Sequence, residues 1–350
     1  MATLKIKNVR IAGISAGVPK SVINNLEIQN ISKDYDAKSF VETTGVIERR
    51  VSQVLTTSDL CKEAAERLIG DIKWDKSDIE ALIFISQTRD YIEPATACIL
   101  QDKLGLSKDC YCLDVSLGCS AWVYGLSMLA SLMQMGQIKK GLLCVGDAKR
   151  LCPLEDDDAL FGHAGTVTAL EYDEDSSEMT FDLGTDGSGY DAIIIPDGGA
   201  RNPFTEKSLV MEDCDGKMLN RLMTHMKGMD VFSFGITTAP KSIKKVAKEV
   251  GGSETPWLDY DYYILHQANM KMNEFIIKKL KLPKEKVPFS MPYFGNTSSA
   301  SIPLTIVTQL KGKIENCPTK LLCCGFGIGL SWGSVSLTTN RLVISDLVEV

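Results

Sequence analysis

The sequence predicts an α/β fold made of two halves with similar architecture. Strand-like and helix-like segments alternate along the chain, as they do in proteins with a mostly parallel sheet. Two strand-like segments, Ala81–Ser86 and Gly141–Gly146, are short and apolar throughout, as expected for strands buried on both faces. The length of 350 residues exceeds that of one typical domain. We therefore expect two halves that each contribute to a core.

The order of predicted elements is similar in both halves. In the first half we expect strands at Lys5–Ile14, Ala81–Ser86, Tyr111–Val115 and Lys140–Gly146, and helices at Thr57–Ile69, Ala95–Leu104 and Cys119–Met135. In the second we expect helices at Asp230–Val250, Asn269–Leu280 and Ser298–Leu310, and strands at Tyr262–His266, Lys320–Cys324 and Ser331–Thr338. The acidic stretch 171–178 contains no aliphatic residue, which indicates an exposed connector. We divide the chain there, into residues 1–178 and 179–350.

Composition excludes several classes of protein. The chain is 44% hydrophobic and 24% charged, as is usual for a soluble enzyme. It has no apolar run near the roughly 20 residues of a membrane span, and its start alternates charged and apolar residues, unlike an export signal. A formal net charge of -7 disfavours binding to nucleic acid. We expect a cytoplasmic protein that neither spans a membrane nor binds nucleic acid.

The eleven cysteines do not predict disulfides or a metal site. They are scattered and odd in number, which is typical of small buried side chains. A cysteine-based metal or redox protein is a competing interpretation. It would use Cys110, Cys112 and Cys119, or Cys323 and Cys324, but these spacings match neither CxxC pairs nor a zinc site completed by histidine.

Cys119 is the candidate nucleophile. It lies where a β-rich stretch ends at Gly118 and a helical pattern begins. Backbone N–H groups and the positive end of a helix stabilise a thiolate, so we expect a lowered pKa for Cys119. The competing interpretation is an unreactive buried cysteine. Trp122, on the same helix, could line a tunnel or belong to the core, and its spacing favours the core.

Two further candidates come from the second half. His266 ends a buried-strand pattern, and ligands of α/β sheets usually bind at the carboxyl ends of strands. Asn296 follows Gly295 in a turn ahead of a helix. A core histidine and a plain turn asparagine are the competing interpretations.

A glycine-rich segment near the C-terminus separates two strand-like runs. Gly325, Gly327 and Gly329 allow the backbone to approach a reacting group closely. A main-chain N–H near Gly327 or Ile328 could then donate to an oxyanion. A nucleotide-binding loop is disfavoured, because the segment lacks a phosphate-binding lysine and a following helix.

Taken in order, five motifs resemble those of the type III β-ketoacyl-acyl-carrier-protein synthases. They are TTGVIERR at Thr43–Arg50, the turn at Cys119, LHQANM, FGNTSSASIPL and GFGIGLSWGS. The resemblance covers nearly the whole chain. It implies a thiolase-like fold, in which two duplicated βαβαβαββ halves form five αβαβα layers. It also implies a homodimer and a catalytic trio of Cys119, His266 and Asn296.

The activity implied by the resemblance is a decarboxylative Claisen condensation. Cys119 takes an acyl group from a coenzyme A or acyl-carrier-protein thioester, and a malonyl-type thioester then loses carbon dioxide to give an enolate. His266 and Asn296 hold the enolate oxygen, and the N–H groups of Cys119 and Ile328 form an oxyanion hole. The product is a 3-oxoacyl thioester, and no bound cofactor or metal is required. The alternative is an acyltransferase of the same fold, passing the acyl group to an alcohol, amine or thiol.

The chain departs from the family pattern at positions that concern substrate recognition. Ser39 and Thr43 stand where the family's tryptophan and arginine grip coenzyme A. Four acidic residues stand near the usual basic docking position, namely Glu155, Asp156, Asp157 and Asp158. His163 replaces the family's aspartate in FGHAG, and we expect a structural role for it. These changes favour a pathway other than primary fatty-acid initiation.

Glu93 is a further departure, in the loop SQTRDYIEPATAC. In the family this loop reaches the partner subunit's acyl pocket and carries an apolar residue at that position. The resemblance to head-to-head acyl-condensing enzymes implies that Glu93 approaches Cys119 of the partner subunit. A loop carboxylate pointing to solvent is the alternative.

Overall fold

A computed structural model describes residues 2–28, 36–148, 159–214 and 217–350. The acidic residues at positions 155–158, at which the sequence departs from the family pattern, lie outside the described residues. Two large sheets organise the molecule.

The larger sheet has seven strands in the order β17-β2-β8-β7-β5-β6, with β18 also paired to β2. Its strands are β2 (Val9–Val18), β5 (Ala81–Ile85), β6 (Tyr111–Val115), β7 (Lys140–Asp147), β8 (Ala164–Tyr172), β17 (Val343–Ile344) and β18 (Val348–Glu349). The core strands β5 and β7 are parallel and in register, with Ala81 opposite Gly141 and Ile85 opposite Val145. Both are buried along most of their length, as their unbroken apolar sequences predict.

The second sheet has five strands in the order β1-β9-β16-β15-β14. Its strands are β1 (Ala2–Ile6), β9 (Met179–Thr185), β14 (Tyr262–Leu265), β15 (Thr319–Gly327) and β16 (Ser331–Thr339). Strand β14 runs parallel to β15, and the remaining neighbours are antiparallel.

Each end of the chain supplies strands to the sheet that is formed mainly by the other half. The single strand predicted at Lys5–Ile14 is wrong, because Asn8 adopts a left-handed φ of 62° and separates β1 from β2. Strand β1 then pairs with β9 in the smaller sheet, whereas β17 and β18 pair with β2 in the larger one. The described ends therefore each complete the sheet of the opposite half, and the division at residue 178 stays a prediction.

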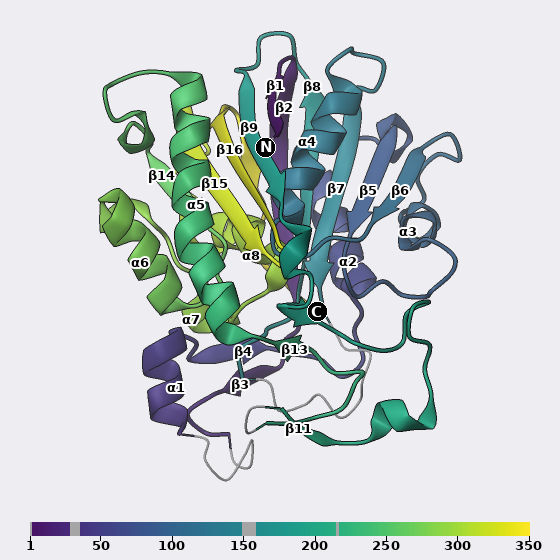
Figure 1. Cartoon of the computed structure of the whole chain (residues 1–350). Coiled ribbons are helices and arrows are strands. Elements are labelled where there is room, and N and C mark those ends of the chain that lie inside the picture. The colour runs from purple at the N-terminus through teal and green to yellow at the C-terminus, as the bar shows by residue number, and fades with distance from the viewer. Residues whose placement is uncertain (1, 29–35, 149–158, 215–216) are drawn as a thin grey trace.

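Helices cover both sheets and separate them, so that the layers follow the order αβαβα (Figure 1). Helices α5 (Gly228–Val250) and α6 (Met270–Leu280) cover the smaller sheet, and α2 (Thr57–Ile72) and α3 (Thr96–Leu104) cover the larger. Between the sheets lie α4 (Ala121–Met133) and α8 (Ser301–Thr305), which contact strands of both. The predicted five-layer thiolase-like fold is confirmed.

Helix α4 has buried residues around most of its circumference because it lies between the two sheets. Trp122 is fully buried in this core, and its Nε1–H donates to the Thr168 hydroxyl at 2.9 Å. Its side chain belongs to the core, as its spacing predicts.

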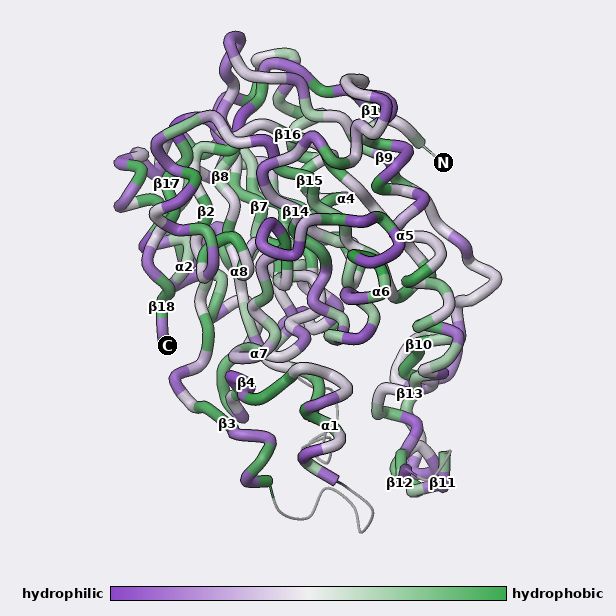
Figure 2. Tube along the Cα trace, turned by 90° about the vertical axis from the view of Figure 1, so that its left-hand side faces the viewer, coloured by the Kyte–Doolittle hydropathy of each residue, from purple (hydrophilic) through white to green (hydrophobic). Residues whose placement is uncertain are grey.

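The lower part of the molecule consists of shorter elements (Figures 1 and 2). These are α1 (Ala37–Thr44), α7 (Met291–Phe294) and the paired strands β3 (Val22–Asn24) and β4 (Glu48–Arg50). An arm between residues 186 and 227 adds the pairs β10 (Ile193–Ile194) with β13 (His225–Met226) and β11 (Glu212–Cys214) with β12 (Lys217–Leu219). No helix or strand is predicted from the sequence of this arm, since its strands have only two or three residues.

Replacing Trp122 with alanine should reduce the free energy of unfolding by about 3–5 kcal/mol, because a large fully buried side chain leaves a cavity. Urea unfolding followed by circular dichroism measures the loss. Trp74→Ala is the matched control, since Trp74 is only partly buried and stacks against Lys140 at the surface. Equal losses in the two variants would contradict the placement of Trp122 in the central layer.

Candidate active site

Cys119 lies in the short turn between β6 and α4. The helix starts at Ala121, whose N–H donates to the Gly118 carbonyl at 2.8 Å. The Cys119 side chain is partly buried and lines a cavity of about 370 Å³. The sulfur is therefore accessible from the cavity and is otherwise enclosed by protein.

The backbone of β15 passes directly over this turn. A Cβ atom at Gly327 would lie 2.7 Å from both Cβ and Sγ of Cys119, and one at Gly325 would lie 2.8 Å from the Cys119 carbonyl oxygen. Only glycine permits so close an approach. As a result, the N–H of Ile328 is near enough to the Cys119 sulfur to favour its thiolate form.

The expected lowering of the Cys119 pKa is not found. Burial raises the pKa of Cys119 to about 11, and the negative charge of Asp147 adds to the rise. Hydrogen bonds from the Ile328 N–H and the Ser298 hydroxyl favour the thiolate and only partly oppose this rise. At neutral pH the free side chain is a thiol, because loss of hydration outweighs its position near a helix start.

His266 immediately follows β14. Its N–H donates to the Cys324 carbonyl at 2.8 Å, and its ring lies edge-on to Phe326 with the centroids 5.6 Å apart. Nδ1 hydrogen-bonds to the Ser301 hydroxyl at 2.7 Å. Burial lowers the pKa of His266 to about 3, so the imidazole is neutral at physiological pH.

Asn296 is held in the turn between α7 and the helical turn Ser298–Ala300. Its Oδ1 accepts the N–H of Ser298 at 2.9 Å, and its Nδ2 donates to the Ala268 carbonyl at 3.5 Å. Its main chain is held as well, since its N–H donates to the Leu160 carbonyl at 2.9 Å. These contacts fix the orientation of the carboxamide, and Nδ2 keeps a second N–H available.

The three predicted trio residues line the same cavity, although they come from distant parts of the chain. The cavity is also lined by Ile328, the residue predicted to supply an oxyanion donor. Its remaining wall includes the polar side chains of Gln87, Thr88, Ser116, Asp147, Thr224, Asn269 and Ser298, and the apolar side chains of Ile193, Ile194, Ile195, Met226, Val231, Met272 and Phe326.

His163 also lines this cavity. Its Nδ1 accepts the N–H of Ser52 at 3.1 Å, and its own N–H donates to the Arg50 carbonyl at 2.7 Å. These contacts join the 161–163 segment to β4 and the residues after it. They agree with the structural role expected for His163.

Glu93 does not line the cavity of its own chain. It lies in the exposed loop tip 91–94, where Tyr91 is 61% and Ile92 is 80% exposed. Glu93 therefore does not contribute to the cavity around Cys119 of the same protomer, and its predicted approach to a partner subunit stays a prediction.

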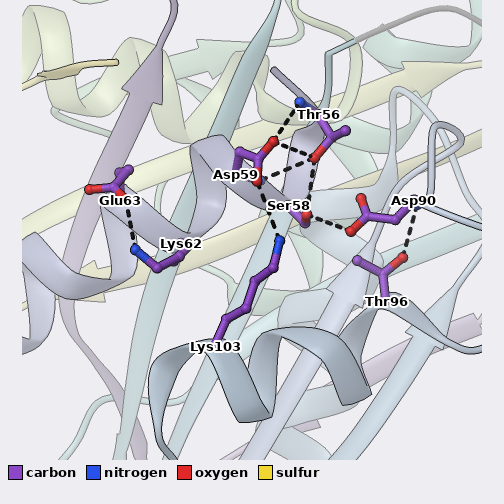
Figure 3. Close-up of polar contacts among 8 residues, drawn as sticks. All are labelled: Thr56, Ser58, Asp59, Lys62, Glu63, Asp90, Thr96 and Lys103. Atoms are coloured by element: carbon purple, nitrogen blue, oxygen red, sulfur yellow. Dashed lines mark hydrogen bonds and ion pairs between the residues drawn. The ribbon is translucent and has the colours of Figure 1, made fainter. Parts of the chain in front are cut away.

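The loop that carries Glu93 is anchored firmly at both ends (Figure 3). The Asp90 carboxylate accepts the Ser58 hydroxyl of α2 at 2.7 Å, and the Asp90 N–H donates to Thr96 at 3.1 Å. The first N–H groups of α3, at Thr96 and Ala97, donate to the Asp114 carboxylate at 2.7 Å each. These bonds hold the two ends of the loop against α2 and β6.

Several residues that shape the site were missed from the sequence. The arm contributes Ile193, Ile194 and Met226 to the cavity wall, and no periodic signal marks strands this short. Asp147 could have been found, because it ends the buried strand β7 at the edge of the sheet where ligands bind.

The structure gives no support to the competing metal interpretation. Among the residues whose positions are described, no three His, Cys, Asp or Glu side chains are grouped so as to hold a metal ion.

None of the helices in the described part of the chain has the length and apolar character needed to cross a bilayer.

Replacing Gly327 with alanine should slow alkylation of Cys119 by iodoacetamide by on the order of 100-fold, since the added methyl group would displace the reacting sulfur. The rate is read from the mass of the Cys119 peptide. Gly187→Ala is the control, because a Cβ there meets no atom within 4 Å. An unchanged rate in Gly327→Ala would contradict the close contact of β15 with the turn.

Comparison with known proteins agrees with this geometry. Residues 113–187 match the family model of 3-oxoacyl-[acyl-carrier-protein] synthase III, and residues 253–339 match the model of its C-terminal part. The chain is 31% identical to a β-ketoacyl-[acyl-carrier-protein] synthase III of Clostridium acetobutylicum, over 96% of this chain and 100% of that protein. It is 32% identical to a putative 3-oxoacyl-[acyl-carrier-protein] synthase 3 of Campylobacter jejuni, over 98% of each.

A solved structure extends the similarity to three dimensions. The crystal structure of a 3-oxoacyl-(acyl-carrier protein) synthase from Burkholderia xenovorans superposes with a TM-score of 0.90 at 35% identity, covering 100% of this chain and 99% of that one. The resemblance seen in the five sequence motifs is confirmed, and the chain belongs to the 3-oxoacyl-[acyl-carrier-protein] synthase III family.

Proposed function

We propose that this protein is a condensing enzyme that joins an acyl group on Cys119 to a malonyl-type thioester, releasing carbon dioxide and a 3-oxoacyl thioester. The observation that carries the proposal is the convergence of Cys119, His266 and Asn296 on one cavity, with the Ile328 N–H at the sulfur. The names of the relatives, all 3-oxoacyl or β-ketoacyl synthases, support the same reaction.

The first step is acyl transfer from a thioester to Cys119. A neutral thiol must lose its proton as it attacks, and the neutral imidazole of His266 is in the correct state to accept it. The proton then leaves with the departing thiol of the first substrate. The N–H groups of Ile328 and Cys119 would hold the carbonyl oxygen while it carries negative charge.

The second step needs donors for an enolate oxygen. Loss of carbon dioxide from the malonyl-type thioester leaves this enolate, and Nε2 of His266 and Nδ2 of Asn296 can donate to it. The Ser301 hydroxyl can donate to or accept from Nδ1. The Ser301 hydroxyl therefore supports both tautomers of His266. In one, Nδ1 carries the proton and Nε2 can accept one; in the other, Nε2 carries the proton and can donate it. A plain acyltransferase would have no use for the Asn296 amide in this place.

The substrates are thioesters of coenzyme A or of an acyl carrier protein, and the chemistry requires no bound cofactor. The replaced grip residues Ser39 and Thr43 lie on α1. The Lys271 ammonium on α6 hydrogen-bonds to the Thr43 hydroxyl at 3.3 Å. Lys271 is two residues beyond Asn269, which lines the cavity. Lys271 is therefore our candidate for the positive charge that meets a phosphate of the substrate.

Intact-mass spectrometry after incubation with a panel of acyl thioesters tests the first step. The unaltered protein should gain one acyl mass, and Cys119→Ala should gain none, because only the sulfur can carry the acyl group. Asn296→Ala should still acylate, yet should lose condensation by roughly 100- to 1000-fold, as expected for loss of one oxyanion donor. Acylation of Cys119→Ala to the same extent as the unaltered protein would refute the assignment.

A homodimer would give Glu93 a place near the active site of the partner subunit. Strand β6 lies at the end of the larger sheet and pairs with β5 alone in the described strand order. An open edge of this kind, beside the exposed Tyr91 and Ile92, is suited to pairing with a second copy. We infer that the chain forms a homodimer at this edge and that Glu93 extends towards Cys119 of the partner subunit, where it acts on the second substrate.

Mixed dimers test this arrangement. Cys119→Ala and Glu93→Ala should each be inactive or strongly impaired in condensation. Dissociated and reassociated as an equal mixture, they should recover about a quarter of the wild-type number of sites, because half of the dimers then hold one intact Cys119 with an intact Glu93 from the other chain. Size-exclusion chromatography with light scattering checks the dimer. No recovery, or full activity of Glu93→Ala, would remove Glu93 from the site.

A further inference from the structure

A carboxylate shares the cavity with the proposed nucleophile and has no role in the chemistry described above. Asp147 is the last residue of β7, and it is partly buried in the cavity wall. A carboxylate near a thiol that must ionise works against the reaction. Its presence therefore needs a physical explanation.

The Asp147 carboxylate joins the segments that surround Cys119. Its Oδ1 accepts the Ser86 hydroxyl at 3.0 Å, the Gln87 N–H at 2.8 Å and the Thr88 hydroxyl at 3.5 Å. Its Oδ2 accepts the Ser299 hydroxyl at 3.1 Å. One side chain thus connects the end of β7, the residues after β5 and the helical turn that follows Asn296.

Ser298 links this carboxylate to the sulfur. It lines the cavity together with Asp147 and Cys119, and its hydroxyl favours the charged form of each of these two groups. The N–H of Ser298 is held by Asn296 Oδ1 at 2.9 Å, and its φ of 49° is in the left-handed region. These two features fix the backbone that carries the hydroxyl.

We propose that Asp147 is a positioning residue for Cys119: acting through the Ser298 hydroxyl and through its own charge, it sets how readily the thiol loses its proton. The proposal rests on Cys119 being the reactive thiol of the proposed function. The negative charge adds to the effect of burial in favouring the thiol form of the resting enzyme. The serine hydroxyl has one proton, which it can donate to the carboxylate while the sulfur is a thiol and to the sulfur once the thiolate forms.

Within the described ranges, no ionisable side chain forms an ion pair with Asp147. From α2, Cys61 is close enough for Asp147 to raise its pKa. Across the cavity lie His266, which is neutral, and the side chains of His163 and Arg49. Arg49 instead donates to Asn25 at 2.9 Å and to the Phe161 carbonyl at 3.2 Å.

The negative charge of Asp147 sets the direction in which the ionisation of Cys119 shifts. Withdrawal from water raises the pKa of Asp147 above that of an exposed aspartate, and the hydrogen bonds from Gln87 and the nearby serines lower it. Once ionised, the carboxylate opposes a second negative charge on the sulfur. Neutralising Asp147 should thus move Cys119 ionisation to lower pH, whereas removing the Ser298 hydroxyl should move it to higher pH, since a donor to the thiolate is lost.

The rate of Cys119 alkylation by iodoacetamide between pH 6 and 11, followed on the Cys119 peptide by mass spectrometry, tests the proposal. Asp147→Asn should shift the midpoint downward by about one pH unit, the usual effect of removing a nearby like charge. At a fixed pH below the midpoint, this shift is about a tenfold gain in rate. Ser298→Ala should shift the midpoint upward.

Opposite shifts of the alkylation midpoint in Asp147→Asn and Ser298→Ala distinguish an effect on Cys119 ionisation from a general loosening of the cavity. If the two variants only loosened the cavity, water would reach the sulfur in both, and both midpoints would fall; that result, or an unmoved midpoint in either variant, overturns the proposal. Asp182→Asn is the matched control. The Asp182 carboxylate is fully buried, bonded to Ser242 and Lys245 and absent from the cavity wall, so its loss should not shift the midpoint.

Two provisions keep the test decisive. If Asp147→Asn does not fold, Asp147→Ser replaces it, because a hydroxyl oxygen can accept from the same donors without carrying charge. Alkylation needs no acyl substrate, so it reports on the thiol even if Cys119 proves not to accept acyl groups from thioesters. Failure of this inference is thereby separable from failure of the proposed function.

Discussion

The site depends on one contact between backbones, in which β15 of the smaller sheet lies against the Cys119 turn attached to the larger sheet. Atoms of Cys119 and Ser120 occupy the space in which Cβ atoms at Gly325 and Gly327 would stand. Because no side chain separates the two backbones, an N–H of one half can reach a sulfur of the other. The remaining features of the cavity are arranged around this contact.

The enclosed position of the contact explains the electrostatics of the site. Enclosure removes water from the thiol and the imidazole, which raises the pKa of Cys119 to about 11 and lowers that of His266 to about 3. The resting pair is therefore neutral, and the site contains no thiolate–imidazolium ion pair. A neutral pair suits a two-step reaction, because the proton moves only when an acyl group arrives and the imidazole is again free for the second substrate.

The two halves also depend on each other through the chain ends. Strand β1 closes the smaller sheet against β9, and β17 and β18 extend the larger sheet at β2. Helices α4 and α8 fill the space between the sheets and contact strands of both. Relative motion of the halves would break main-chain pairing as well as core packing, which keeps the Cys119 turn and β15 in register.

Apolar runs and helical periodicity predict the α/β class and most strands and helices, and the ordered motifs around Cys119, His266 and Asn296 carry the resemblance that implies the layered fold and the trio. Three features could not be predicted in this way: the ionisation of Cys119, the environment of Asp147 and the contribution of the 186–227 arm to the cavity. The physical reason is that desolvation and through-space charge depend on which distant segments meet, and a helix start read from the sequence does not show what encloses it.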